Sequence, residues 1–142
     1  MNRARFIAAS ASLPLMLATT AYAEPVSWIA VSKTAMAITG DIVLDEYSLT
    51  FANGESLDLE PYEADRVGDW AGSGEEVAGY VYKIDPSADP ELLNGNRLCG
   101  TPVTYVVVWS PGEGELTLNA YSGKAAPTGT ERLCASYSYE VP

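Results

Sequence analysis

Short apolar runs, most of them alternating with polar residues, recur along this chain, and no long amphipathic helical pattern interrupts them. Runs of this kind cover residues 77–84, 101–110, 115–122 and 132–141. A period of two places successive side chains on opposite faces of a strand, so such a run predicts a strand with one buried face. Asn53-Gly54 separates two further runs within residues 47–59. This dipeptide between alternating hydrophobic residues predicts a β-hairpin.

A further strand is expected in residues 34–44, which are rich in Ile, Val and Thr, whereas residues 61–75 are polar and contain glycine, which favours a loop. The chain therefore predicts seven or eight short strands with turns about 8 to 14 residues apart, a spacing typical of antiparallel barrels and sandwiches. We expect an all-β fold, a small antiparallel barrel with an up-and-down meander, because closure removes unpaired edge strands. A two-sheet β-sandwich is the alternative.

One short helix is expected near residues 89–95. Asp89 is a preferred N-cap, and the proline that follows it suits the first helical position. Gly95 supplies the left-handed residue that ends a helix. We expect Leu92 and Leu93 to face the core, so that the helix closes one end of the barrel.

Residues 1–23 have the layout of a secretory signal peptide. Arg3 and Arg5 precede an apolar run, and the segment ends in the small-x-small sequence that closes on Ala23. The apolar run is shorter than the ~20 residues that span a bilayer. We expect cleavage after Ala23, export to the periplasm or the extracellular space, and a mature chain of residues 24–142 that forms one soluble domain without membrane insertion.

Cys99 and Cys134 are the two cysteines of the sequence. In an exported chain an even pair predicts a disulfide. The bond would close a loop of about 35 residues and stabilise the fold by roughly 4 kcal/mol in the chain-entropy model. A redox-active pair is the alternative, but it favours the close spacing of Cys-x-x-Cys.

The mature chain carries 19 acidic and six basic residues. Fourteen of the carboxylates lie in residues 41–91, where Arg66 and Lys83 are the basic residues. This charge repels nucleic acid and anionic membranes, so neither is an expected partner. It attracts a basic protein or a divalent cation, although acidic side chains also keep an exported domain soluble. The oligomeric state stays open.

Histidine is absent from the sequence. Its absence excludes Ser-His-Asp and Cys-His machinery and the usual zinc sites. The sequence also lacks the glycine patterns that bind phosphates and dinucleotides, so no cofactor is expected. Oxygen ligands for calcium gather at Asp85, Asp89, Glu91, Asn94 and Asn96, but their spacing is not that of an EF-hand, and we expect no metal site. We expect a non-enzymatic protein, with a carboxylate-dependent enzyme such as a glycoside hydrolase as an alternative.

Two groups of side chains are candidates for binding. Acidic and aromatic residues that could anchor a basic partner are Glu60, Tyr62, Glu63, Asp65, Asp69 and Trp70. The alternative for this group is a solvated loop with Trp70 packed on the core. Tyrosines that could line a ligand face or an open barrel mouth are Tyr80, Tyr82, Tyr137 and Tyr139. Their alternative is cross-strand packing within the sheet.

These observations lead to a first hypothesis of an exported soluble binding protein, a binder or inhibitor of a basic protein through residues 41–91. A small-ligand carrier in a lipocalin-like barrel is the second hypothesis, and it requires an internal cavity of several hundred Å³. The general description, an exported acidic β-domain with one disulfide, is similar to that of periplasmic lysozyme inhibitors and lipocalin-like binders. That similarity is one of class, without a shared motif.

Overall fold

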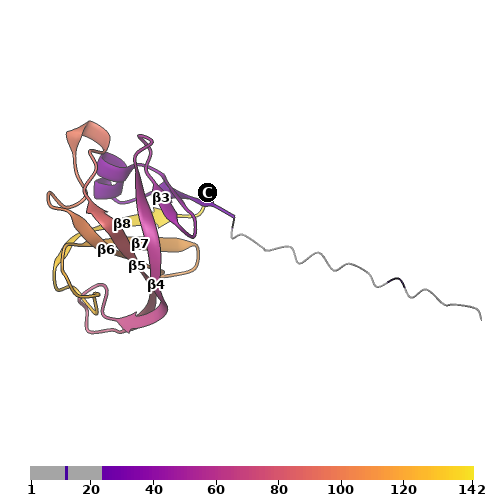
Figure 1. Ribbon diagram of the computed structural model, residues 1–142, viewed down its shortest axis with the longest axis vertical. Coiled ribbons are helices and arrows are strands. Elements are labelled where there is room, and N and C mark those ends of the chain that lie inside the picture. The colour runs from indigo at the N-terminus through magenta and orange to yellow at the C-terminus, as the bar shows by residue number, and fades with distance from the viewer. Residues whose placement is uncertain (1–11, 13–23) are drawn as a thin grey trace, which may run out of the picture.

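Eight antiparallel strands pair in chain order and close into a barrel (Figure 1). The structure is a computed structural model that describes residues 12 and 24–142. The strands are β1 Val26–Ala30, β2 Ile42–Leu44, β3 Ser48–Thr50, β4 Ser56–Gly68, β5 Val77–Ala88, β6 Val103–Trp109, β7 Glu115–Tyr121 and β8 Leu133–Glu140. The barrel closes where β1 pairs with β8, Ala30 opposite Tyr139. The predicted all-β meander is confirmed, and a barrel rather than a sandwich is formed.

The signal-peptide prediction concerns residues 1–23, which lie outside the described part of the chain apart from Ser12. Within the described residues, no helix has the length and apolar character needed to cross a bilayer.

The interior of the barrel is filled by the inward-facing side chains of all eight strands. Residues such as Leu49 on β3, Leu57 on β4, Leu118 on β7 and Tyr137 on β8 are at most 1% exposed and belong to one apolar cluster. The alternation seen in the sequence is the cause, because every second residue points inward. An eight-stranded barrel is just wide enough for such side chains to fill.

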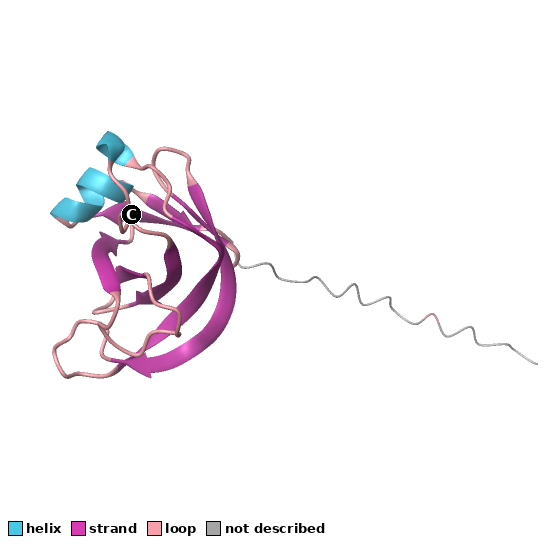
Figure 2. Cartoon of the chain, turned by 60° about the vertical axis from the view of Figure 1, so that its left-hand side comes forward, coloured by secondary structure: helices cyan, strands magenta, loops and turns pink. Residues whose placement is uncertain are grey.

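Two short helices lie at the same end of the barrel (Figure 2). The helix predicted near residues 89–95 is present only as a 3₁₀ turn, η2 Leu93–Gly95. Asp89 does not cap it, because its carboxylate accepts hydrogen bonds from the amides of Leu98 and Cys99 instead. Asn94 has a φ of 58°, and this left-handed residue prevents a longer helix.

The prediction of strand structure in residues 34–44 is wrong for the part that precedes Gly40. Ala35–Thr39 forms a single π-helical turn, η1, and only Ile42–Leu44 is a strand. The Ser32 hydroxyl accepts a hydrogen bond from the Ala35 amide at 3.1 Å, as a capping side chain does. The helical turn is also held by the barrel, since the Thr39 and Tyr139 hydroxyls are hydrogen-bonded at 2.7 Å. Tertiary contacts thus override the β-propensity of the segment.

The loop predicted for residues 61–75 is also wrong in part, because β4 continues through Pro61 to Gly68. The register between β4 and β5 shifts twice, between Pro61 and Glu63 and between Glu63 and Arg66. A register shift of this kind accommodates a proline, which has no backbone N–H to donate to the sheet, and it bends the strand. The polar composition that suggested a loop reflects a strand whose outer face meets solvent.

A second apolar cluster lies on the outer face of β5, β6 and β7. It contains Trp70, Val81, Tyr105, Val107 and Tyr121. Two loops, residues 69–76 and 122–132, contribute to this outer layer and contact each other, since the Asp69 amide donates to the Thr128 carbonyl at 3.3 Å. This part of the sheet therefore has buried side chains on both faces.

Candidate functional site

Exposed acidic side chains alternate with buried leucines along the first half of β4. Leu57 and Leu59 point inward and are buried, and the residues between and after them are exposed. We define the β4 acidic face as Asp58, Glu60, Tyr62, Glu63 and Asp65, all of which are exposed. Four of the six residues predicted from the sequence to bind a basic partner are thus exposed in one segment of β4.

Tyr62 is the aromatic centre of this face, and 53% of its surface is exposed. Its ring meets that of Tyr105 edge to face, with the centroids 5.9 Å apart and the planes at 82°. The Arg66 guanidinium lies 5.9 Å from the centroid of the Tyr62 ring. Arg66 also forms an ion pair with Glu63 at 2.9 Å. These contacts orient an exposed ring without burying it, which lowers the entropy lost when a partner covers it.

Asp69 and Trp70, the other two predicted residues, have structural roles instead. The Asp69 carboxylate accepts hydrogen bonds from the amides of Ser73 at 3.0 Å and Gly74 at 2.9 Å. Trp70 is 1% exposed and donates its indole N–H to the Val77 carbonyl at 2.9 Å. Trp70 is therefore core, and the prediction that it contacts a partner is not supported by its position.

Salt bridges are scarce in this acidic chain. Within residues 24–142, the Arg66–Glu63 pair is the one ion pair that the structure shows. Asp45, on the turn between β2 and β3, accepts hydrogen bonds from the Tyr47 amide and from Ser48, which lowers the pKa of its carboxyl. Most other carboxylates of residues 41–91 are exposed. Their charge acts on the surroundings of the protein rather than within it.

The four candidate ligand-face tyrosines do not form an exposed surface. Tyr82, Tyr137 and Tyr139 are 6%, 0% and 1% exposed inside the barrel, and Tyr80 is half-buried beside them. The rings of Tyr80 and Tyr82 stack with centroids 4.4 Å apart. The Tyr137 hydroxyl donates to the Leu98 carbonyl at 3.0 Å. Three of the four are therefore core residues.

Burial raises the pKa of these interior phenols. Desolvation is the main cause, because the phenolate would lie among apolar side chains. It raises the pKa of Tyr82 to about 12 and that of Tyr137 to about 12. It also raises the pKa of Tyr139, in which the hydrogen bond to Thr39 acts in the opposite direction. The hydroxyls stay neutral at physiological pH and cannot serve as bases.

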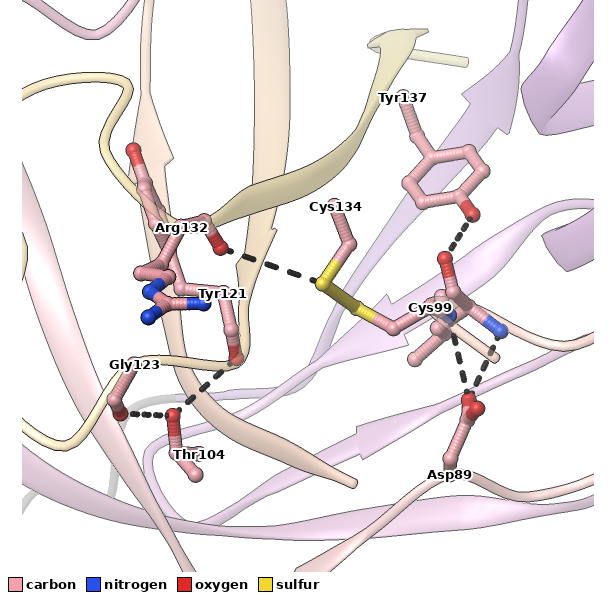
Figure 3. The surroundings of a disulfide bond; sticks show 9 residues. Asp89, Cys99, Thr104, Tyr121, Gly123, Arg132, Cys134 and Tyr137 are labelled. Atoms are coloured by element: carbon pink, nitrogen blue, oxygen red, sulfur yellow. Dashed lines mark hydrogen bonds between the residues drawn. A yellow bond between two sulfur atoms is a disulfide. The ribbon is translucent and has the colours of Figure 1, made fainter. Parts of the chain in front are cut away.

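The disulfide predicted from the sequence is present between Cys99 and Cys134 (Figure 3). It joins the loop that follows η2 to the start of β8, with the two Cα atoms 5.1 Å apart. The Asp89 carboxylate holds the Cys99 side of the bond through the amides of Leu98 and Cys99. A disulfide of this kind is typical of proteins in oxidising compartments.

Metal-binding geometry is not found in the described residues, since no three acidic or cysteine side chains come together in a way that could hold an ion. Three of the oxygen ligands considered from the sequence have other hydrogen-bonding roles. The Asp89 carboxylate accepts hydrogen bonds from backbone amides. The side-chain amides of Asn94 and Asn96 donate to the Ala37 carbonyl at 3.1 and 3.3 Å. These residues thus fasten η2 to η1.

Two features escaped sequence reasoning. Asn119, in the middle of β7, is 0% exposed and donates to the Trp70 carbonyl at 2.9 Å and to the Tyr121 hydroxyl at 3.0 Å. The second is a hollow of about 760 Å³ formed by residues 121–132. A polar residue within an otherwise apolar strand was the available signal for Asn119, because buried amides need partners. The Pro/Gly composition of the loop contained no signal for the hollow.

No protein-family model, curated protein sequence or solved structure matches this chain.

Proposed function

We propose that the mature protein is an exported, non-enzymatic binding protein that engages a basic protein through the β4 acidic face. The observation that carries the proposal is a strand surface with four exposed carboxylates around a half-exposed tyrosine, of which only Glu63 has a cationic partner among the described residues. The disulfide and the features of residues 1–23 support export to an oxidising compartment.

Charge and apolar contact area have separate roles in the proposed binding. Exposed carboxylates accelerate the approach of a cationic partner and fix its orientation. A tyrosine held by its neighbours contributes apolar contact at low entropic cost, and tyrosine is enriched among residues that dominate interface energies. Tyr62, fixed by Tyr105 and Arg66, fulfils this second requirement.

The other hypotheses receive less support. The filled barrel interior gives no support to a carrier of the lipocalin type. A carboxylate-dependent enzyme needs two carboxyl groups that face each other across a cleft. The hollow formed by residues 121–132 has a single carboxylate, Glu131, on its lining.

The test is a pull-down from periplasmic extract with the immobilised mature protein at ~0.05 M and ~0.5 M salt, because screening shortens the reach of charge from above 10 Å to a few Å. The face variant combines Glu60→Gln, Glu63→Gln and Asp65→Asn. A matched control changes three exposed carboxylates elsewhere, through Glu24→Gln, Glu113→Gln and Glu131→Gln. Both variants have the same net charge.

We expect a basic protein to be retained at low salt by the wild type and the control and to be lost from the face variant. The Tyr62→Ala substitution should weaken the affinity for this basic protein about tenfold at either salt concentration. A loss of this size is typical of a moderate interface hot spot. Equal loss from the face variant and the matched control would show that only net charge matters and would refute the proposed face. Retention that is indifferent to salt would also refute it.

A further inference from the structure

The loop between β7 and β8 lines an open hollow of about 760 Å³. Its lining includes charged side chains, hydroxyls and an apolar wall that contains Ala126 and Pro127. The volume lies within the 300–1,000 Å³ that is typical of small-molecule sites. The hollow lies outside the barrel interior, so a ligand could enter it without opening the sheet.

The charge around the hollow has the opposite sign to that of the molecule. Lys124 and Arg132 are two of the six basic residues of the mature chain, and both line the hollow together with one acidic residue, Glu131. Neither cation forms a salt bridge within residues 24–142. In a chain this rich in carboxylates, two unpaired cations on one lining leave a local excess of positive charge.

The loop is fixed from several sides. The Tyr121 hydroxyl donates to the Gly129 carbonyl at 2.8 Å, and the Ser122 amide donates to the Arg132 carbonyl at 3.1 Å. The Thr104 hydroxyl donates to the Tyr121 carbonyl at 3.2 Å (Figure 3). A hollow whose rim is already ordered loses little entropy on binding.

Arg132 has a backbone conformation that few L-residues adopt, with a φ of 62°. A left-handed backbone is strained for a non-glycine residue, and strained residues cluster at active sites and ligand-binding sites. Its side chain packs along Gly123, since a Cβ added there would lie 3.2 Å from both Cβ and Cγ of Arg132. The strained backbone and this contact direct Arg132 along the rim of the hollow.

We propose that this hollow binds a small organic anion, with its carboxylate, sulfonate or phosphate group between Lys124 and Arg132 and its apolar part against Ala126 and Pro127. Charge-assisted hydrogen bonds from the guanidinium and the ammonium supply orientation, and the apolar wall supplies buried area. This site is independent of the β4 acidic face, and either proposal can fail without the other.

The probe is 8-anilinonaphthalene-1-sulfonate, an anionic fluorophore with an apolar ring system, titrated into the folded, oxidised mature protein. We expect one saturable site. Arg132→Gln should weaken the affinity about tenfold and Lys124→Gln about threefold, whereas Arg132→Lys should retain most of it. Lys83→Gln, which makes the same change in net charge on β5, is the matched control and should change the affinity by less than twofold. N-phenyl-1-naphthylamine, which lacks the sulfonate, should bind the wild type and Arg132→Gln equally.

Thermal unfolding of each variant checks that the fold is intact, and Lys124→Gln decides the matter if Arg132→Gln does not fold. Equal weakening by Lys83→Gln and Lys124→Gln would overturn the proposal, because the response would then follow net charge. Non-saturable fluorescence, or a loss of the neutral probe with Arg132→Gln, would overturn it as well.

Discussion

Tyrosines buried in the barrel should make the protein lose stability steeply in alkaline solution. Tyr82, Tyr137 and Tyr139 are at most 6% exposed, and desolvation raises the pKa of each above its ordinary value of about 10. In the unfolded chain these phenols ionise near pH 10, whereas the folded barrel keeps them neutral. The stabilising effect is therefore fully present below about pH 10 and is lost as the pH rises through the folded-state pKa values.

The size of the stability loss follows from the thermodynamic linkage between proton binding and folding. Each tyrosine whose folded pKa lies near 12 or above contributes a loss of about 1.3 kcal/mol of stability between pH 9 and pH 11, most of it above pH 10. The three together amount to about 4 kcal/mol, a large part of the 5–15 kcal/mol that a domain of this kind has in total. For a urea m-value of about 2 kcal/mol/M, the unfolding midpoint should fall by about 2 M.

The assay is urea unfolding at pH 9 and pH 11, followed by circular dichroism, with tyrosinate absorbance at 295 nm recorded in the folded and unfolded states. The control is Tyr82→Phe, because the Tyr82 hydroxyl has no hydrogen-bond partner among the described residues and the ring is retained. This variant should lose about 1.3 kcal/mol less than the wild type between pH 9 and pH 11. Identical losses, or tyrosinate absorbance in the folded protein that follows the unfolded curve, would contradict the reasoning.

Three further changes test other parts of the fold by urea unfolding. Replacing Cys99 and Cys134 together with serine should lower the stability by up to about 4 kcal/mol, and free-thiol titration of the unreduced wild type should detect no thiol. Asn119→Ala should cost about 2–3 kcal/mol, because it leaves buried hydrogen-bonding groups without partners, and an unchanged midpoint would show that water replaces the amide. Glu140→Lys should stabilise by about 0.5 kcal/mol, because Glu140 lies directly opposite Glu115 on β7, and any stability gain should shrink in high salt.

Local patterns in the sequence predict much of the barrel. The hairpin at Asn53-Gly54 is present, with Gly54 at a φ of 89° and the Phe51 amide donating to the Glu55 carbonyl at 2.8 Å. The disulfide and the meander order follow from equally local signals, namely the cysteine count and the short turns. These features depend on the residues involved and little on distant parts of the chain.

Features that depend on distant contacts could not be predicted in the same way. Ala35–Thr39 is helical because Thr39 meets Tyr139 across the barrel, a contact between residues 100 positions apart. Trp70 is buried because residues 69–76 fold back over Val81 and Val107, and the sequence left both a partner contact and a core position open for this residue. Lys124 and Arg132 line the same hollow only because the β7–β8 loop folds back on itself.

The two apolar clusters on opposite faces of β5–β7 imply that the protein opens in two stages rather than one. The outer cluster is covered in large part by two loops, whereas the inner cluster is enclosed by all eight strands. Segments with fewer buried contacts detach at lower free energy than the global unfolding reaction. Amide hydrogens of the two loops should therefore exchange with solvent well before those of Val106 and Leu118. A chain with detached loops retains a closed barrel but exposes the apolar side chains of Tyr105 and Val107. We expect this partly unfolded state to aggregate in concentrated solution.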